Sequence, residues 1–307
     1  MKPDLPVWRS LLYVPVNVEK YVDKAHTRGA DCIQLDLEDS VPASEKEVAR
    51  TLVPAAARKV RRAGADVVVR INSPLEAAFK DLDLCIGPDV DGIAVTKTQN
   101  PSYVQKIDEA VSNLERKRGL SAGHTRLIAM IETPAAFFEM AAIARSSPRL
   151  AAMNIGGEDF ALEAGMEPLE ETLLMPKQQM IFAARSAGLM PLGFIASVAG
   201  YGDWEAFRKM VRRSRRFGFM GAGCIHPGQV PIVNEEYTPG AEEAAYARRV
   251  VEENAKAEAA GRGSFAIEGK MIDVPVVVRA QRLLARLAAI EAREARKRAV
   301  QQSGQMS

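Results

Sequence analysis

The 307-residue chain has the composition of an ordinary folded enzyme, with 47% hydrophobic and 26% charged residues. Its 41 basic and 39 acidic residues leave a net charge of +2, which gives no electrostatic basis for nucleic-acid binding. No apolar run has the length of a signal sequence or a membrane span, and the three separated cysteines give neither a disulfide framework nor a zinc spacing. We therefore expect a cytoplasmic protein with no nucleic-acid or membrane partner.

Short apolar runs alternate with helical patterns along most of the chain. After a polar arm at residues 1–9, eight strands are predicted at residues 11–16, 32–37, 67–71, 92–95, 127–131, 151–155, 193–198 and 221–225. Helices are predicted at residues 18–28, 44–63, 79–85, 103–118, 134–145, 175–187 and 204–216. This alternation favours a (β/α)8 TIM barrel over a doubly wound sheet, because no glycine-rich phosphate-binding loop follows the first strand.

The remaining residues exceed what a barrel needs. We predict a catalytic barrel domain at residues 1–238, a C-terminal helical extension at 239–300 and a disordered tail at 301–307. Within the extension, helices at 239–260 and 276–299 flank a polar, glycine-punctuated loop that carries Asp273. Such a loop suits a lid or an arm onto a neighbouring subunit. An aspartate in it would, on the sequence alone, more often be solvated than functional.

Charged side chains follow the predicted strands, and a barrel gathers the C-terminal ends of its strands around one mouth. These residues are Asp36, Glu38, Asp39, Arg70, Lys97, Glu132, Glu158, Asp159 and His226. So many acids at one mouth would repel one another, and a divalent cation resolves the repulsion. Ligands that are all oxygen favour Mg²⁺, with Glu132 and Asp159 as its protein ligands.

Several of these residues have two readings. Arg70 offers a planar fork suited to a substrate carboxylate, but it could instead pair with Asp36 or Glu38 in a structural network. Lys97 is equally compatible with a solvated surface lysine. The glycines of the Gly156-Gly157 pair would leave backbone N–H groups open to a metal-bound substrate.

Eight segments together resemble the citrate lyase beta-subunit-like group of the HpcH/HpaI aldolase superfamily. They are RSLLYVP at 9–15, DLEDSV at 36–41, RIN at 70–72, Lys97, IETP at 131–134, GED at 157–159, IHP at 225–227 and GKMIDVP at 269–275. These segments span nearly the whole chain. The resemblance implies a (β/α)8 barrel with a C-terminal helical lid, assembled as a homotrimer or hexamer.

The resemblance also implies a reaction. It is the magnesium-dependent cleavage, or formation, of a 3-hydroxyacyl thioester such as malyl-, citramalyl- or citryl-CoA, which yields a keto acid and an acetyl thioester. The resemblance and the positions at the strand ends together assign site residues to three roles. Glu132 and Asp159 would bind the metal, and Arg70, Glu132, Gly157 and Lys97 would bind the substrate. The predicted catalytic residues are Asp273, Arg70, Glu38 and Asp36. Asp273 would act in acid–base chemistry from the lid.

Three places depart from the usual pattern of this group. Thr96 stands where proline is common, Leu192-Gly193 where an isoleucine-aspartate pair is common, and Ala222-Gly223 where a lysine is common. Because of these departures, the resemblance does not determine the thioester carrier or the acyl group. Two alternatives therefore remain: a CoA-independent pyruvate-type aldolase, and an acyl-carrier-binding subunit of a larger lyase complex.

Overall fold

The computed structural model describes residues 5–196, 202–261 and 263–304. The parts of the predicted elements that fall on residues 1–4, 197–198 and 305–307 lie outside the described residues. The chain divides into two compact units, of which the second is Thr238–Ala299 and the first is formed by the rest.

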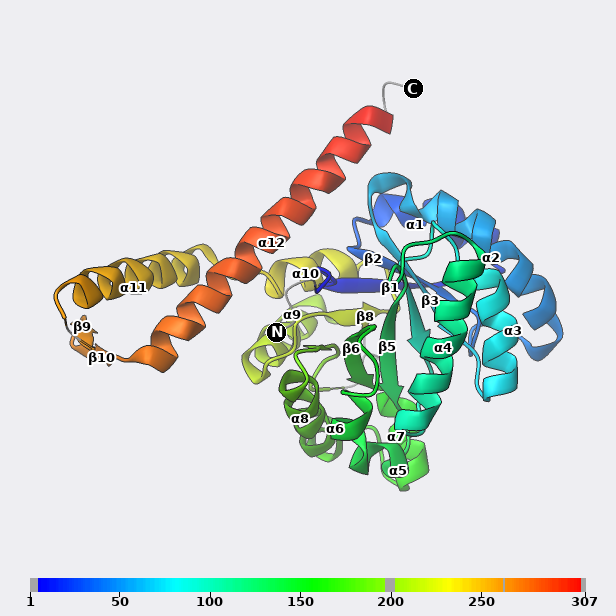
Figure 1. Ribbon diagram of the computed structural model, residues 1–307, viewed down its shortest axis with the longest axis horizontal. Helices are drawn as coiled ribbons and strands as arrows, with labels where there is room; N and C mark the ends of the chain where they lie inside the picture. The colour runs from blue at the N-terminus through cyan, green and yellow to red at the C-terminus, as the bar shows by residue number, and fades with distance from the viewer. Residues whose placement is uncertain (1–4, 197–201, 262, 305–307) are drawn as a thin grey trace. The chain divides into compact units, whose positions relative to one another are not determined.

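Eight parallel strands form the sheet of the first unit (Figure 1). They are β1 Ser10–Pro15, β2 Cys32–Asp36, β3 Asp66–Ile71, β4 Gly92–Val95, β5 Arg126–Ile131, β6 Leu150–Ile155, β7 Met190–Pro191 and β8 Ala222–Cys224. Their order is β7-β6-β5-β4-β3-β2-β1-β8, so each strand from β1 to β7 pairs with its neighbour in sequence. The predicted α/β class with eight parallel strands is confirmed. Beyond the strand ends, Leu192 and Gly221 form a parallel bridge.

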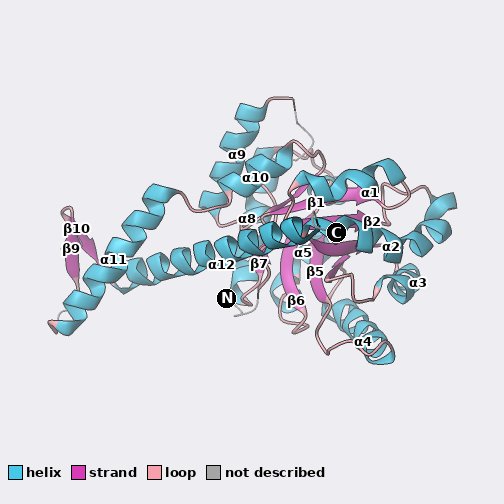
Figure 2. Ribbon diagram, turned by 90° about the horizontal axis from the view of Figure 1, so that it is seen from above, coloured by secondary structure: helices cyan, strands magenta, loops and turns pink. Residues whose placement is uncertain are grey.

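Helices follow the strands on the outer side of this sheet, as α2, α3 and α4 do in Figure 2. Those of the first unit are α1 Glu19–Ala25, α2 Lys46–Val60, α3 Leu75–Cys85, α4 Pro101–Lys117, α5 Pro134–Phe138, α6 Met140–Ile143, α7 Gly157–Ala164, α8 Glu170–Ser186, α9 Trp204–Phe217 and α10 Gln229–Glu236, with short 3₁₀ turns at His26–Arg28, Ala43–Glu45 and Arg61–Ala63. Side chains cap several of them: Asn100 accepts a hydrogen bond from the Tyr103 N–H, Thr133 accepts one from the Ala136 N–H, and Asp203 accepts one from the Ala206 N–H. None of the helices described is both long and apolar enough to cross a membrane.

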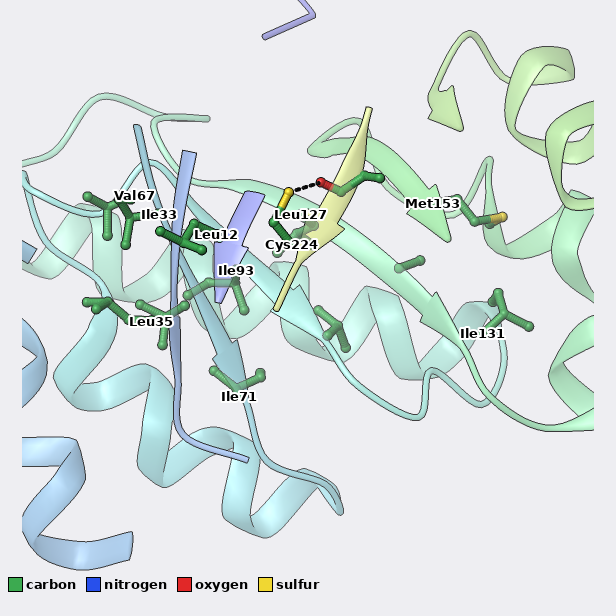
Figure 3. Packing of buried hydrophobic residues seen from close by; sticks show 14 of the residues in the cluster. Leu12, Ile33, Leu35, Val67, Ile71, Ile93, Leu127, Ile131, Met153 and Cys224 are labelled. Carbon is green, nitrogen blue, oxygen red and sulfur yellow. Dashed lines mark hydrogen bonds between the residues drawn. The ribbon is translucent and has the colours of Figure 1, made fainter. Parts of the chain in front are cut away.

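Apolar side chains bury both faces of the sheet, because successive strand residues point to opposite sides. Figure 3 shows the cluster that includes Leu12, Ile33 and Leu127, and this cluster also takes in helix residues such as Val53. The opposite face carries a second cluster, to which Trp8 contributes at 1% exposure. The predicted polar arm is therefore wrong at residues 7–9, which are buried.

Several elements of the structure differ from those predicted. The seventh strand is β7, and residues 193–196 of the predicted strand lie outside it, because Pro191 has no N–H and Gly193 has a φ of 135°, which ends the extended run early. The helix predicted at 134–145 breaks at Glu139 into α5 and α6. Helices α7 and α10 were not predicted, and the opening Gly-Gly pair of α7 is typical of a loop.

The second unit contains α11 Ala241–Ala259, β9 Phe265–Ile267, β10 Lys270–Ile272 and the part of α12 (Val274–Gly304) up to Ala299. The stretch predicted as an open loop thus holds an antiparallel hairpin. Its two turn residues, Glu268 and Gly269, have φ values of 51° and 75°, as in a type I′ turn. Ile272 packs in a small apolar cluster with Val250 and Val277. Because α12 runs to Gly304, the predicted disordered tail is helical at residues 301–304.

Candidate active site

A cavity of about 1020 Å³ lies among side chains from β1, β2, β3, β5, β6, α1, α7, α8 and the segments after β7 and β8. Its wall includes the predicted residues Asp36, Asp39, Arg70, Glu132, Gly157, Glu158, Asp159 and His226. Glu38 and Lys97 are not in the wall but contact residues that are. Asp273 is exposed in the second unit, directly before α12, where its carbonyl accepts hydrogen bonds from the Val276 and Val277 N–H groups.

Glu132 follows β5 and is 2% exposed. Its Oε2 accepts a hydrogen bond of 2.5 Å from the Lys97 backbone N–H, which Lys97 directs by adopting a φ of 46°. A Cβ at Gly156 would lie 2.6 Å from Glu132 Oε1, so only glycine leaves this carboxylate in place. The pKa of Glu132 is raised to about 7, chiefly by burial and further by the charges of Asp159 and Glu38, while the hydrogen bond from the Lys97 N–H opposes the rise.

Asp159 lies in the first turn of α7 and also lines the cavity. Among the described residues, no group of three or more His, Cys, Asp or Glu side chains is arranged to hold a metal ion. Two carboxylates beside an open cavity are nevertheless the set that Mg²⁺ commonly takes from a protein, since water and substrate oxygens complete its shell. The oxygen-only pair Glu132 and Asp159 therefore fits this ion.

Arg70 is only 9% exposed and is surrounded by carboxylates. Its Nε and Nη2 each donate to Asp36 at 2.7 Å, and its Nη1 lies 2.7 Å from Glu38 Oε2. The pairing that the sequence left open is thus present. Burial alone would raise the pKa of Asp36, but the hydrogen bonds and charge of Arg70 outweigh it and hold that pKa low. Lys97 Nζ lies 3.4 Å from Glu38, whose pKa is raised by burial despite Arg70.

Sequence reasoning missed several cations in the wall. Lys20, Lys24 and Arg28 recur every four residues along α1 and the turn after it, and all three line the cavity. That spacing was a usable signal. Lys177 on α8 is 5% exposed, and burial lowers its pKa to about 8. Nothing in the helical pattern around Lys177 distinguishes it from a surface lysine.

Comparison with known proteins identifies the family. The family model described as HpcH/HpaI aldolase/citrate lyase matches residues 9–227. The chain belongs to the HpcH/HpaI aldolase/citrate lyase family. The family predicted from the sequence motifs is thereby confirmed, and the matched range holds every predicted site residue except Asp273.

Members of the HpcH/HpaI aldolase/citrate lyase family resemble this chain along nearly its whole length. The citrate lyase subunit beta of Haemophilus influenzae is 32% identical over 282 residues, which cover 91% of this chain and 96% of that protein. The human mitochondrial citramalyl-CoA lyase is 28% identical, covering 89% of this chain and 83% of the relative. The crystal structure of CitE from Mycobacterium tuberculosis in complex with magnesium, acetoacetate and coenzyme A has a TM-score of 0.72 and 26% identity, covering 94% of this chain and 100% of that one.

Proposed function

We propose that the protein is a magnesium-dependent carbon–carbon lyase that cleaves, or forms, a 3-hydroxyacyl thioester of coenzyme A. Malyl-, citramalyl- and citryl-CoA are the candidate substrates, and the products are a keto acid and an acetyl thioester. The observation that carries the proposal is Glu132, a carboxylate buried beside Asp159 at a cavity wall. The similarity to lyases, and to a protein crystallised with magnesium and coenzyme A, supports it.

Glu132 and Asp159 would hold the metal. When bound, Mg²⁺ would withdraw electron density from the hydroxyl and carboxylate oxygens of the acid half of the substrate and so ease cleavage of the adjacent C–C bond. Gly156 keeps the Glu132 carboxylate in position, and the Lys97 N–H fixes its second oxygen. Gly157, at the first turn of α7, would leave backbone N–H groups open to the substrate carboxylate.

The carboxylates around Arg70 would orient it rather than act as acids. Asp36 is held ionised at neutral pH by Arg70, so it is a poor proton donor. We propose that Asp36 and Glu38 fix the guanidinium, whose remaining N–H surface and charge favour the negative oxygens of the keto acid. Cleavage releases the proton of the substrate hydroxyl, which water in the cavity can accept, and Asp273 is the candidate that gives a proton to the acetyl enolate; in the condensation direction Asp273 removes that proton and the new hydroxyl takes one up.

The row of cations on α1 suits the thioester carrier. Coenzyme A carries a diphosphate and a further phosphate, and Lys20, Lys24 and Arg28 are exposed cations in the wall of the same cavity. This row supports coenzyme A over a small free aldol, which has no phosphate to recognise.

The remaining parts of the proposal concern architecture and setting. The Leu192–Gly221 bridge, with the Met220 N–H donating to Pro191 at 2.9 Å, supports a (β/α)8 barrel closed between β7 and β8. We further propose a homotrimer or hexamer with a lid formed by the C-terminal extension. A reducing cytoplasm suits the three cysteines, all of which are free and buried.

The test is a cleavage assay on chelator-treated protein with malyl-, citramalyl- and citryl-CoA, with and without Mg²⁺. We expect release of a keto acid and acetyl-CoA from at least one thioester only when Mg²⁺ is present. Activity on free 4-hydroxy-2-keto acids instead would identify a CoA-independent aldolase. Inactivity on all CoA esters, with capture of a small acidic acyl-carrier protein, would identify a subunit of a larger complex.

A further inference from the structure

Lys177 places a buried ammonium group at the cavity wall, with little to neutralise it. Its Nζ donates to the Ala196 carbonyl at 2.8 Å, and no carboxylate of the described residues comes within the 4.0 Å of an ion pair. Glu158 and Glu170 attract it only from farther away. A buried cation without a counter-ion costs free energy, and that cost is recovered when an anion binds.

The Gly156-Gly157 pair lies between this ammonium and the predicted metal ligand. A Cβ at Gly156 would lie 2.6 Å from Glu132 Oε1, whereas a Cβ at Gly157 would lie 3.6 Å from Lys177 Nζ. The two contacts involve neighbouring residues that line one cavity, together with Glu132 and Lys177 themselves. A substrate chelated at Glu132 and extending along the glycine pair would approach Lys177.

The charges around the cavity indicate which substrate group would bind Lys177. Acids from β2, β5 and α7 line the cavity and would repel a second carboxylate on the substrate. Arg70 offsets this repulsion only in part, because Asp36 and Glu38 pair with it and its remaining N–H surface is assigned to the keto-acid oxygens. Lys177 is the cation next to the glycine pair that no carboxylate occupies among the residues described.

We propose that Lys177 is a specificity-determining residue that binds the second carboxylate of a dicarboxylic 2-keto acid. The preferred thioester then carries two free carboxylates, as citryl-CoA does, and its keto-acid product is of the oxaloacetate type. This inference rests on the proposed lyase function and specifies its substrate class. Monocarboxylic acids such as pyruvate would bind without using Lys177.

The test measures binding of freshly prepared oxaloacetate and of pyruvate by calorimetry in the presence of Mg²⁺. Wild-type protein is expected to bind oxaloacetate more tightly than pyruvate. Lys177→Gln should lose at least about tenfold in oxaloacetate affinity, the size of one charge-assisted hydrogen bond, while pyruvate affinity changes less than about twofold. Lys177→Arg should keep the preference. Lys209→Gln, which removes an exposed lysine of α9 outside the cavity wall, is the matched control and should leave both affinities unchanged.

Three outcomes would overturn the role of Lys177: equal loss of both acids in Lys177→Gln, no loss of either, or a wild type that binds pyruvate as tightly as oxaloacetate. Equal loss would show that Lys177 only supports the backbone at Ala196. Lys177→Met, which preserves side-chain length in the same buried space, is the second variant if the glutamine variant unfolds. Because binding is read without turnover, a protein with the expected preference but no thioester cleavage contradicts the lyase proposal alone. Thioester cleavage without the preference for oxaloacetate contradicts only the role proposed for Lys177.

Discussion

Two corners of the cavity contain buried carboxylates but treat them in opposite ways. At the ends of β2 and β3, Asp36 and Glu38 are paired with Arg70 at 2.7 Å. At the ends of β5 and β6, Glu132 receives a backbone hydrogen bond from Lys97 and faces another acid, Asp159. The first corner is electrostatically complete, whereas the second gains from a cation.

The difference distinguishes residues that stabilise the fold from residues that bind a ligand. Removing one partner of a buried ion pair typically costs about 3–5 kcal/mol, so the Arg70 corner stabilises the fold and fixes its own geometry. Glu132 has the opposite effect and destabilises the metal-free protein when it is ionised. Raising its pKa from 4.5 to about 7 means that its ionised form is disfavoured by about 3 kcal/mol. A group kept in this state is typical of a ligand-binding site.

The largest expected effect is at the incomplete corner. Glu132→Gln and Asp159→Asn should each lower kcat/KM by at least about a thousandfold, because a bound metal contributes several kcal/mol to transition-state stabilisation. Steady-state assays across a range of Mg²⁺ concentrations measure this loss. Glu158→Gln is the matched control, since it changes the exposed acid next to Asp159 on α7, and it should retain most of the activity. Full activity of either ligand variant in chelator-treated buffer would refute the metal assignment.

Neither corner leaves an acid free to protonate the enolate, so the proton should come from outside both. Asp273→Asn should lower kcat by roughly 10²–10⁴-fold, as for a general acid–base residue, with keto-acid binding nearly unchanged. Glu268→Gln, an exposed acid of the same hairpin, is the control.

Subunit mixing sharpens the Asp273 prediction. If the lid serves a neighbouring subunit, Asp273→Asn protein mixed with Glu132→Gln protein should recover activity in hybrid oligomers. A fully active Asp273→Asn enzyme removes the second unit from the mechanism.

The complete corner should respond mainly through stability. Arg70→Lys replaces a bidentate fork by a point charge, so we expect a lower melting temperature. We also expect keto-acid binding weaker by about 1.5–3 kcal/mol, the range for a charge-assisted hydrogen bond. Thermal unfolding and calorimetry on the same sample separate the two effects. A lower melting temperature with unchanged keto-acid affinity would mean that Arg70 is a structural partner only.

The smallest expected effect is on the metal-free protein. Glu132 holds its proton more tightly when folded, with a pKa of about 7, than when unfolded, with a pKa near 4.5. The free energy of unfolding should therefore fall as pH rises from about 4.5 to about 7 and level off above. Glu132→Gln should raise the melting temperature of metal-free protein at pH 8 by several degrees but not at pH 4.5. Equal stability of the two proteins at pH 8 would show that folding does not raise the pKa of Glu132.

The sequence predicts the fold well wherever apolar runs end in charged residues. Strands β2 to β6 could be placed within about a residue because their buried runs stop sharply. The seventh strand could not, since Pro191 and Gly193 interrupt it within two residues. The hairpin at 265–272 was also missed, because its left-handed turn residue is Glu268 rather than the asparagine or aspartate that signals such turns.

The candidate site was predictable in its residues but not in its contacts. Strand ends nominated Glu132, Asp159 and Arg70 together, because parallel strands gather their C-terminal ends. Nothing in the sequence could show that the Lys97 backbone rather than its ammonium holds Glu132, or that Gly156 must lack a side chain. The burial of Lys177 likewise depends on how α8 packs, which a mixed helical pattern does not reveal.

The most direct test of the metal site is a crystal soaked with Mn²⁺, as an anomalous substitute for Mg²⁺, and pyruvate. We expect one strong anomalous peak within coordination distance of the carboxylates of Glu132 and Asp159 and of the keto-acid oxygens. Ordered pyruvate in the cavity without a metal peak at these two residues, or a peak held by other side chains, would contradict it.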